Sequence, residues 1–377
     1  MLIVLQIILL LAGAVLVVGT VVNLSKHPHW LIRIWDFPRM MTAAAALLIA
    51  GVYGIFFHGA WYDWVFLTAL GLVVARQVFM IAPYTPLGRV RVKPSDRPPG
   101  PASFRLLISN VRMENRDFDR WHAVVREADP DVIVAVETGT PWDQALRSLE
   151  ERYPHFLRQV QDNYYGMVIY SRLPLEDARV RFLVQDDIPS IHATICLKGG
   201  QRVALHALHP RPPEPINDQD SAPRDAELVL MGKEIHENQR AVPTVVCGDL
   251  NDVAWSFTTQ LFLRLSKLLD PRKGRGMYNS FNADSRIFRF PLDHVFHSDE
   301  FKLIDLQRLP HVGSDHFPML IELSCEPESA PGDQPEPTER PDDREQADQI
   351  LDEQANREAT GAEKGHVAET GGNGRGG

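Results

Sequence analysis

The sequence predicts a layered α/β domain that follows an apolar helical region and precedes a polar tail. Three observations support this fold class. Between residues 101 and 325, short apolar runs typical of strands alternate with longer stretches of helical periodicity. Residues 2–22 contain no charged side chain, and beyond Cys325 the chain is rich in proline and acidic residues. At 377 residues the chain is long enough for about two domains.

The N-terminal region has the length and composition of membrane-spanning helices. About 20 apolar residues cross the hydrocarbon core of a bilayer, and residues 2–22, 40–57 and 64–82 each provide such a run. A cleaved signal peptide is the rival interpretation of the first run, but no Lys or Arg precedes it and further apolar runs follow. Arg76 lies within the third run, where it either faces a neighbouring helix or extends to the interface. We therefore expect three transmembrane helices.

Basic residues are unevenly distributed among the loops of this region. Lys26, Arg33 and Arg39 lie between the first two spans, whereas Asp63 is the one charged residue between the second and third. Four more basic residues follow the third span, namely Arg89, Arg91, Lys93 and Arg97. The positive-inside rule then places the first loop, and everything after the third span, in the cytoplasm.

Changes in composition divide the chain into four segments. Residues 95–103 are rich in proline and glycine and cannot continue a helix. The C-terminal segment combines low hydrophobicity, high net charge and repeated proline, which predicts disorder, with a short helix possible over residues 345–357. The expected organisation is a membrane region at 1–86, a linker at 87–102, a globular domain at 103–325 and an acidic disordered tail at 326–377.

Within the globular domain, apolar runs predict more strands than helices. The expected strands are residues 104–108, 132–136, 167–170, 191–196, 203–208, 244–247, 294–297 and 319–323, and the expected helices are residues 117–128, 142–151, 224–236 and 256–268. This mixture indicates an α+β fold or a layered α/β sandwich. This domain contains no GxGxxG and no GxxxxGK[ST], so it gives no support to a dinucleotide site or a P-loop.

Charge and cysteine content exclude several classes of protein. Residues 1–100 carry 8 Lys/Arg and 3 Asp/Glu, residues 101–325 carry 26 and 32, and residues 326–377 carry 5 and 14. The globular domain is therefore acidic, which does not favour the phosphate contacts of a duplex-binding protein. Cys196, Cys247 and Cys325 are too few and too scattered for a disulfide framework or a zinc cluster.

Polar residues follow several of the predicted strands. They are Asn110 in LLISN, Glu137 in VIVAVET, His206 and His209 in VALHALHP, Asp249 and Asn251 in GDLND, Asp293 in PLDH, and Asp315 and His316 in SDH. Each one alone has a structural explanation, such as a turn or a packed histidine. Together they would form an oxygen-rich site for a hard divalent cation, with imidazoles left for proton transfer.

The order of these motifs resembles that of the endonuclease/exonuclease/phosphatase superfamily, whose fold is shared with deoxyribonuclease I. The resemblance covers roughly residues 103–324, and its most specific motifs are GDLND and the final SDH. With apolar spans ahead of the domain, the chain looks like the bacterial membrane-anchored branch, which includes proteins linked to glycopeptide resistance. The resemblance implies a four-layer sandwich, in which two packed sheets are flanked by helices.

The resemblance also implies a set of metal ligands. Glu137 corresponds to the principal carboxylate ligand of Mg²⁺ or Mn²⁺, with Asn110 beside it and Asp315 as a further ligand. A metal held by few protein ligands keeps open positions for water and phosphate oxygens. No sulfur or imidazole cluster in the sequence suits zinc.

The remaining motif residues take catalytic roles by the same resemblance. His316 corresponds to a histidine that acts as a base or as a phosphate ligand, oriented by Asp293. Asp249 corresponds to the group that positions or deprotonates the attacking water, and Asn251 to a carboxamide that holds a phosphate oxygen. His209 corresponds to a strand-end position facing the phosphate. If the register shifts, His206 takes its place.

The expected function is that of a membrane-anchored, divalent-metal-dependent phosphoesterase that directs water in line at a phosphodiester or phosphomonoester. The alternative is a catalytically idle relative that serves as a membrane-tethered binding module. The substrate is a lipid-linked phosphate, a small phosphoester or a nucleic acid, and the acidic domain does not favour the last. The sequence indicates no protein partner.

The expected location is the bacterial cytoplasmic membrane, as a multi-pass protein in contact with the lipid bilayer. Two observations disagree on which side of the membrane carries the catalytic domain. The basic residues favour the cytoplasm, whereas the resemblance to membrane-anchored relatives implies the outer side.

Overall fold

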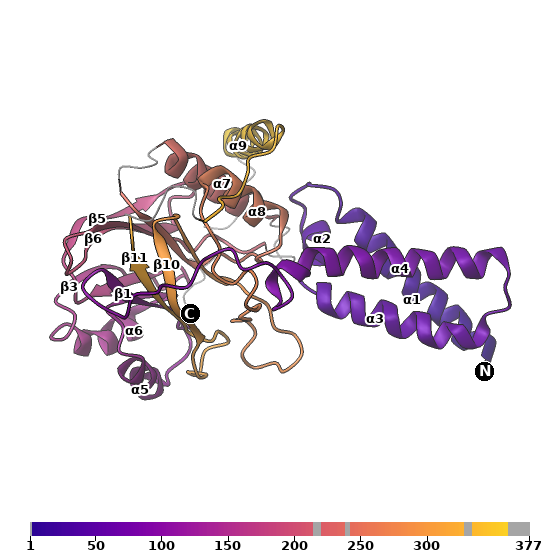
Figure 1. The fold of residues 1–377 in the computed structure, drawn as a ribbon, viewed down its shortest axis with the longest axis horizontal. Coiled ribbons are helices and arrows are strands. Elements are labelled where there is room, and N and C mark those ends of the chain that lie inside the picture. Colours follow the sequence, from indigo (N-terminus) through magenta and orange to yellow (C-terminus); the bar gives the residue numbers. More distant parts are fainter. Residues whose placement is uncertain (1, 214–219, 238–241, 328–333, 361–377) are drawn as a thin grey trace, which may run out of the picture.

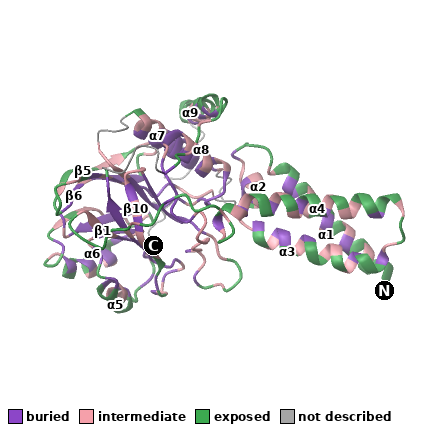
Figure 2. Cartoon of the chain, viewed as in Figure 1, coloured by how far each residue is buried: buried purple, intermediate pink, exposed green. Residues whose placement is uncertain are grey.

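The computed structural model describes residues 2–213, 220–237, 242–327 and 334–360. A bundle of helices at the N-terminal end adjoins a larger domain of sheets and helices (Figure 1). Buried residues concentrate inside the sheet domain, whereas the bundle helices expose much of their outer surface (Figure 2).

Three long helices form the bundle: α1 (Leu2–Val22), α3 (Arg39–Tyr53) and α4 (Trp61–Ile81). Short helices connect or extend them, namely α2 (Trp30–Arg33), η1 (Ile34–Asp36), η2 (Gly54–Phe56) and η3 (Ala82–Tyr84). Asp63 fixes the start of α4, because its carboxylate accepts hydrogen bonds from the backbone N–H groups of His58 and Ala60. Within the described residues, three helical spans are long and apolar enough to cross a membrane: Leu2–Val22, Arg39–Phe56 and Trp61–Tyr84.

Two sheets make up the centre of the larger domain. The six-stranded sheet has the order β10-β11-β1-β2-β4-β3, and the five-stranded sheet has the order β5-β6-β7-β8-β9. The strands are β1 (Ser103–Asn110), β2 (Val132–Val136), β3 (His155–Gln159), β4 (Met167–Ser171), β5 (Leu175–Phe182), β6 (Pro189–Cys196), β7 (Arg202–Ala207), β8 (Thr244–Asp249), β9 (Asp293–His297), β10 (Phe301–Arg308) and β11 (Met319–Cys325). The pairs β1–β2 and β7–β8 are parallel, and the other pairs are antiparallel.

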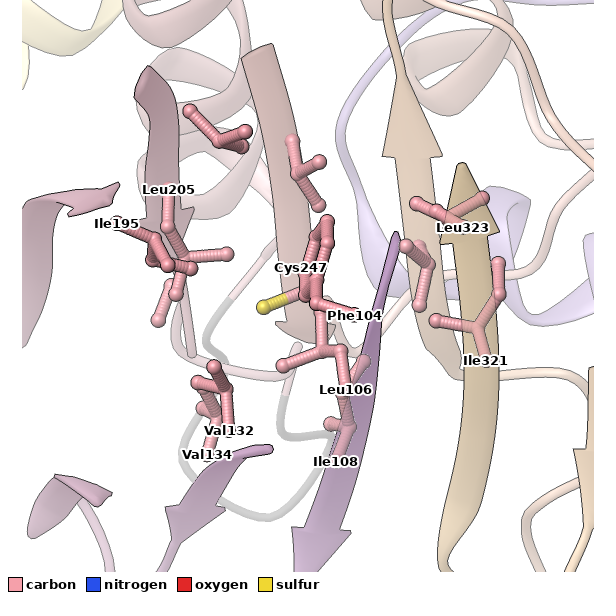
Figure 3. Packing of buried hydrophobic residues seen from close by; sticks show 14 of the residues in the cluster. Phe104, Leu106, Ile108, Val132, Val134, Ile195, Leu205, Cys247, Ile321 and Leu323 are labelled. Carbon is pink, nitrogen blue, oxygen red and sulfur yellow. The ribbon is translucent and has the colours of Figure 1, made fainter. Parts of the chain in front are cut away.

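The main core lies between the two sheets. Phe104, Leu106 and Ile108 alternate along β1 and face Cys247 of β8 (Figure 3). Each of these residues is at most 1% exposed, so the inner face of β1 is removed from water. Burial of this apolar face is the main force that holds the two sheets together.

Helices cover the outer faces of both sheets. On the six-stranded sheet, α5 (Phe118–Ala128) and α6 (Thr140–Leu146, extended by η4, Arg147–Leu149) bury Trp121 and Trp142. On the five-stranded sheet, α7 (Ala222–Glu237) and α8 (Phe257–Ser266) bury apolar residues such as Leu228 and Phe262. The arrangement is a four-layer α/β sandwich, so the predicted fold class is confirmed.

The C-terminal segment departs from its expected disorder where it is described. Residues 328–333 and 361–377 lie outside the described residues, but Asp343–Thr360 forms α9, which contains the short helix allowed for residues 345–357. Ala347, Ile350 and Leu351 lie on one face of α9 and pack against α7 and α8. The sequence allowed this helix but did not predict that it packs, because average polarity was weighed and not these three apolar residues at helical spacing.

The bundle and the sandwich meet at a packed junction. The Trp255 indole donates a hydrogen bond to the carbonyl of Asp36 at 2.7 Å, and the Tyr84 hydroxyl donates to the carbonyl of Ala254 at 2.7 Å. Ile81, Tyr84 and Trp255 belong to one buried apolar cluster. The loop after α1 and the segment after α4 therefore lie at the same end of the bundle as the sandwich.

Candidate active site

The predicted polar residues come from strand ends that meet at one edge of the sandwich. Asn110 ends β1, Glu137 follows β2, and Asp249 ends β8. Because β1 and β2 are parallel, their carboxyl ends face the same edge. Asp293 begins β9 directly opposite Asp249, since these strands are antiparallel. The topology thus places side chains from both sheets in one region.

Asn110 links the carboxylates of the two sheets. Its side-chain amide donates to Glu137 Oε1 at 2.7 Å and to Asp249 Oδ2 at 3.0 Å. Its Oδ1 atom accepts from the backbone N–H of Arg112 at 2.9 Å, which fixes the orientation of the amide. In this arrangement Asn110 presents nitrogen, not oxygen, to the carboxylates, so coordination of a cation through Oδ1 would require the amide to rotate.

Backbone geometry positions both carboxylates. Glu137 has a φ of 60°, and its Oε2 atom accepts from the backbone N–H of Met113 at 3.2 Å. In the GDLND motif, a Cβ atom on Gly248 would lie 2.0 Å from the carbonyl oxygen of Leu208. Only glycine allows the β8 backbone to approach β7 this closely just before Asp249.

Burial makes both carboxyl groups reluctant to ionise. It raises the pKa of Glu137 to about 7, an effect that the hydrogen bond from Asn110 reduces. Asp249 is 1% exposed, and burial raises its pKa as well, against the opposing effect of His316. A divalent cation between these groups would favour their ionised forms.

His316 and Asp293 form a buried pair. His316 Nδ1 lies 2.7 Å from Asp293 Oδ2, and His316 Nε2 lies 3.5 Å from Asp249 Oδ2. Burial alone lowers the pKa of His316, but the charges of Asp293 and Asp249 outweigh it and raise this pKa to about 10. The ring is therefore an imidazolium at neutral pH, which suits a donor to a phosphate oxygen better than a base.

Two contacts hold the SDH loop in place. The Ser314 hydroxyl donates to the carbonyl of Asn110 at 2.8 Å and accepts from the backbone N–H of His316 at 3.0 Å. The Phe281 ring lies against the His316 ring, with centroids 4.9 Å apart. Phe281 thus lies beside the site.

His209 lies near the same carboxylate oxygen of Asp249 as His316. Its Nε2 atom is 3.9 Å from Asp249 Oδ2, and burial lowers its pKa to about 4, so the ring is neutral. Asn251, with a φ of 50°, donates its backbone N–H to Asp249 Oδ1 at 2.9 Å. Its side-chain amide donates to the carbonyl of Pro210 at 3.0 Å.

Two of the histidines quoted from the motifs lie outside this region. His206 faces His192 of the neighbouring strand, with their Nδ1 atoms 2.7 Å apart. His294 contacts Arg272 through Nδ1 and donates a hydrogen bond from Nε2 to the carbonyl of Asp252 at 2.8 Å. His209 is thus the strand-end histidine near Asp249, and His294 does not face His316.

Two of the expected metal ligands are in direct contact. Asn110 donates to Glu137 at 2.7 Å, and Asp315 Oδ1 lies 3.4 Å from the Ser314 hydroxyl. Within the described residues, the group whose possible ligand atoms lie within 4.8 Å of one another is Asp249, Asp293 and His316.

The donor set fits a hard divalent cation. The carboxylates of Glu137 and Asp249 both contact Asn110, and Asp293 lies beside Asp249. Asp293 Oδ1 is buried without a hydrogen-bond partner among the described residues. An orphaned carboxylate oxygen beside other carboxylates is the environment that a cation with oxygen ligands requires.

The sequence did not indicate the side chains that hold the GDLND loop in place, of which Arg224 is the main one. The Arg224 guanidinium donates to the carbonyl of Asn251 at 2.7 Å and lies 3.6 Å from Asp252 Oδ1. Asp252 is the last residue of the GDLND motif, but nothing in the sequence indicated that a buried arginine lies beside it. Arg224 lies on α7, far away in sequence, and no local pattern marks it.

Comparisons with known proteins agree with this architecture. A sequence model described as "Endonuclease/Exonuclease/phosphatase family" matches residues 107–316. The search of curated proteins gave no match.

Several solved structures are similar in fold. A protein of that family from Bacteroides vulgatus is 17% identical, with 59% of this chain and 99% of that chain covered and a TM-score of 0.49. One from Beutenbergia cavernae is 17% identical, with 60% and 72% covered and a TM-score of 0.47. The human Nocturnin catalytic domain is 16% identical, with 59% and 94% covered and a TM-score of 0.47.

Proposed function

Because the chain belongs to the endonuclease/exonuclease/phosphatase family, it is a metal-dependent phosphoric ester hydrolase, and we propose that it acts as a membrane-anchored phosphoesterase that uses Mg²⁺ or Mn²⁺. The observation that carries the proposal is the buried contact of Asn110 with Glu137 and Asp249, next to the His316–Asp293 pair. A family member could retain the fold without these residues, so their joint presence supports catalysis.

The cation would be held by Glu137 and Asp249, with Asn110 beside them. When bound, it would supply the positive charge that neutralises phosphate oxygens. Asp315 as a further ligand stays a prediction.

The protonation states of His316, Asp249 and His209 indicate their catalytic roles. His316 is an imidazolium at neutral pH, so it can donate to a phosphate oxygen as negative charge develops there. Asp249 has a raised pKa and is the group suited to accept a proton from an attacking water. His209 is neutral and buried, and its Nδ1 atom has no partner among the described residues.

The apolar helices support the membrane part of the proposal. In the three candidate spans, 17%, 33% and 22% of the most apolar window is buried within the protein, so most of each helix surface needs an apolar environment. The sandwich lies at the bundle end that carries Lys26, Arg33 and Arg39, and the positive-inside rule supports the cytoplasmic side for it. A reporter fused after Arg97 would distinguish this from the outer side that the resemblance implies.

Hydrolysis by the full chain in detergent tests the proposal. Purified protein should hydrolyse a generic phosphodiester or phosphomonoester in Mg²⁺ or Mn²⁺, lose activity in excess EDTA and recover it when the cation is restored. Undiminished activity in EDTA would refute the metal requirement. If a panel of such esters binds in the presence of the cation but none is hydrolysed, the idle binding module becomes the better account.

A further inference from the structure

A cavity of about 600 Å³ lies at the junction of the helical bundle and the sandwich, away from the carboxylates of the active site. Its walls come from the loop after α1, the end of α4, the segment after α4, and α8. A second cavity of about 570 Å³ shares Phe79, Arg91, Lys273 and Arg340 with the first, so the two are adjacent, and the second is also lined by Asp270 and Glu336.

The lining of the first cavity is strongly basic. Eight of its residues are cationic, namely Lys26, Arg33, Arg39, Arg76, Arg91, Arg264, Lys273 and Arg340, and Asp36 is the one acidic residue. Positive charges gathered around a recess attract an anion, because they repel one another when nothing lies between them.

Half of these cations already have carboxylate partners. Arg33 and Arg39 pair with Asp36, and Arg33 also with Asp225. Lys26 pairs with Asp342, and Arg264 with Asp343.

The other half have none. Among the described residues, no carboxylate lies within 4.0 Å of the charged groups of Arg76, Arg91, Lys273 or Arg340. Burial lowers the pKa of Lys273, and the nearby Arg91 and Arg264 lower it further while Asp270 opposes them. Four cations thus line the cavity without a direct ion pair to a carboxylate among the described residues.

The position of the cavity relative to the helices indicates the source of the anion. It lies where α1 ends at Val22, α3 begins at Arg39 and α4 ends at Ile81. If these helices span a bilayer, as the proposed function states, their ends lie at the level of the lipid headgroups. Basic recesses at this level are suited to lipid phosphates.

An apolar surface continues from the cavity along α4. Phe79 lines the cavity and is 72% exposed, and Leu72, two turns earlier on the same face, is 67% exposed. Arg76 lies between them on that face. The surface therefore offers cations for a headgroup next to apolar side chains for an acyl chain, which a free phosphate would not use.

We propose that this cavity binds the phosphate headgroup of an anionic phospholipid, with an acyl chain along the Leu72–Phe79 face of α4. This inference rests on the proposed membrane anchoring, but not on hydrolysis. Because the walls come from both the bundle and the sandwich, a bound lipid ties the two parts together and stabilises the fold.

Thermal unfolding of the full chain in a neutral detergent tests the inference. Short-chain phosphatidylglycerol should raise the Tm by about 4 °C, and phosphatidylcholine of the same chain length should not. The double variant Arg91→Gln/Arg340→Gln should lose most of this shift. Both residues are exposed, so the variant should fold. Arg120→Gln/Arg126→Gln on α5, far from the bundle, is the matched control and should keep the shift.

Four outcomes would overturn the inference. These are an equal shift from phosphatidylcholine, an equal shift from inorganic phosphate, an unchanged shift in the Arg91/Arg340 variant, and no shift at all. If the chain stays monodisperse without detergent, membrane anchoring fails too. Because the readout is stability, an inactive chain that still shows the selective shift would contradict the proposed hydrolysis alone.

Discussion

His316 and Asp293 act as one unit in this site, because the 2.7 Å contact both orients the ring and keeps it charged. We predict that His316→Ala and Asp293→Ala each reduce turnover by about 10²–10⁴-fold. The double variant should be little worse than His316→Ala alone, since each change removes the same oriented imidazolium.

The comparison requires turnover of the three variants at saturating Mg²⁺ on one ester. His206→Gln is the matched control, because this half-buried histidine pairs with His192 outside the site. Losses that multiply in the double variant would show that the two residues act separately.

Cation binding should depend on pH through Glu137. Without a cation its pKa is about 7, so below pH 7 the carboxyl is mostly protonated and must lose its proton before it can bind a metal. We predict that Mn²⁺ affinity rises as the pH increases from about 5.5 to 7.5, with proton release on binding. Calorimetry in buffers of different ionisation enthalpy measures both quantities. A flat affinity across this range would contradict the assignment of Glu137 as a ligand.

The sequence alone indicated the site residues at the ends of strands, but not the side chains that hold these residues in place. Glu137, Asp249 and His316 follow apolar runs in a recognisable order, so their convergence could be predicted. Arg224 reaches the Asn251 carbonyl from a helix, and only the tertiary fold brings them together.

Among the elements, α9 is the one whose role changes most from the sequence-based expectation. It buries Ala347, with Ile350 and Leu351 partly buried against the same cluster, and Asp343 at its start makes an ion pair with Arg264. We predict that truncation before residue 340 costs about 2 kcal/mol, from lost apolar burial. This corresponds to a fall in Tm of about 4–8 °C.

Thermal unfolding in detergent measures this effect. Truncation after Thr360, which keeps α9, is the control and should leave the Tm nearly unchanged. An equal Tm for both truncations would show that α9 contributes nothing to the fold.

The strands that sequence analysis missed are β3, β5 and β10, and each lies at the edge of a sheet. An edge strand has one neighbour and is half-exposed, so its side chains are mixed and form no continuous apolar run. The edge strand β9 was predicted because all five of its residues are buried. A run of apolar residues in the sequence therefore predicts a buried strand, but it does not reveal a strand whose side chains are partly exposed.

Over the whole molecule, a buried set of charges joins the helical bundle to the loop that carries Asp249. Asp225 accepts hydrogen bonds from Arg33 in the first loop and from Arg224, which in turn holds the Asn251 carbonyl. These side chains are between 1% and 4% exposed, so the loss of one charge leaves the others uncompensated.

We predict that Asp225→Ala destabilises the full chain by about 3–5 kcal/mol and reduces turnover, because the loop that carries Asp249 loses its support. Tm and turnover in detergent measure the two effects. Glu234→Ala removes a more exposed partner of Arg181 and should cost about 1 kcal/mol or less. A variant of Asp225 that matches the Glu234 variant would contradict the coupling between bundle and loop.

The relative placement of bundle and sandwich could not be predicted from the sequence. Composition separated the regions, but the junction depends on contacts such as Trp255 with Asp36, 219 residues apart, which no local pattern records. The sequence could not therefore show that the basic loop and the catalytic domain share one end of the bundle.

The most direct test of the central claim, a metal-dependent hydrolytic site built on Glu137, is the turnover of Glu137→Gln in saturating Mg²⁺ compared with Glu322→Gln. Glu322 lies on β11 and pairs with Arg105 away from the site, so its change controls for loss of a glutamate charge. We predict that Glu137→Gln lowers turnover by about 10²-fold or more, while Glu322→Gln stays close to the unmodified chain. Full activity in Glu137→Gln would contradict the assignment of this cluster as the active site.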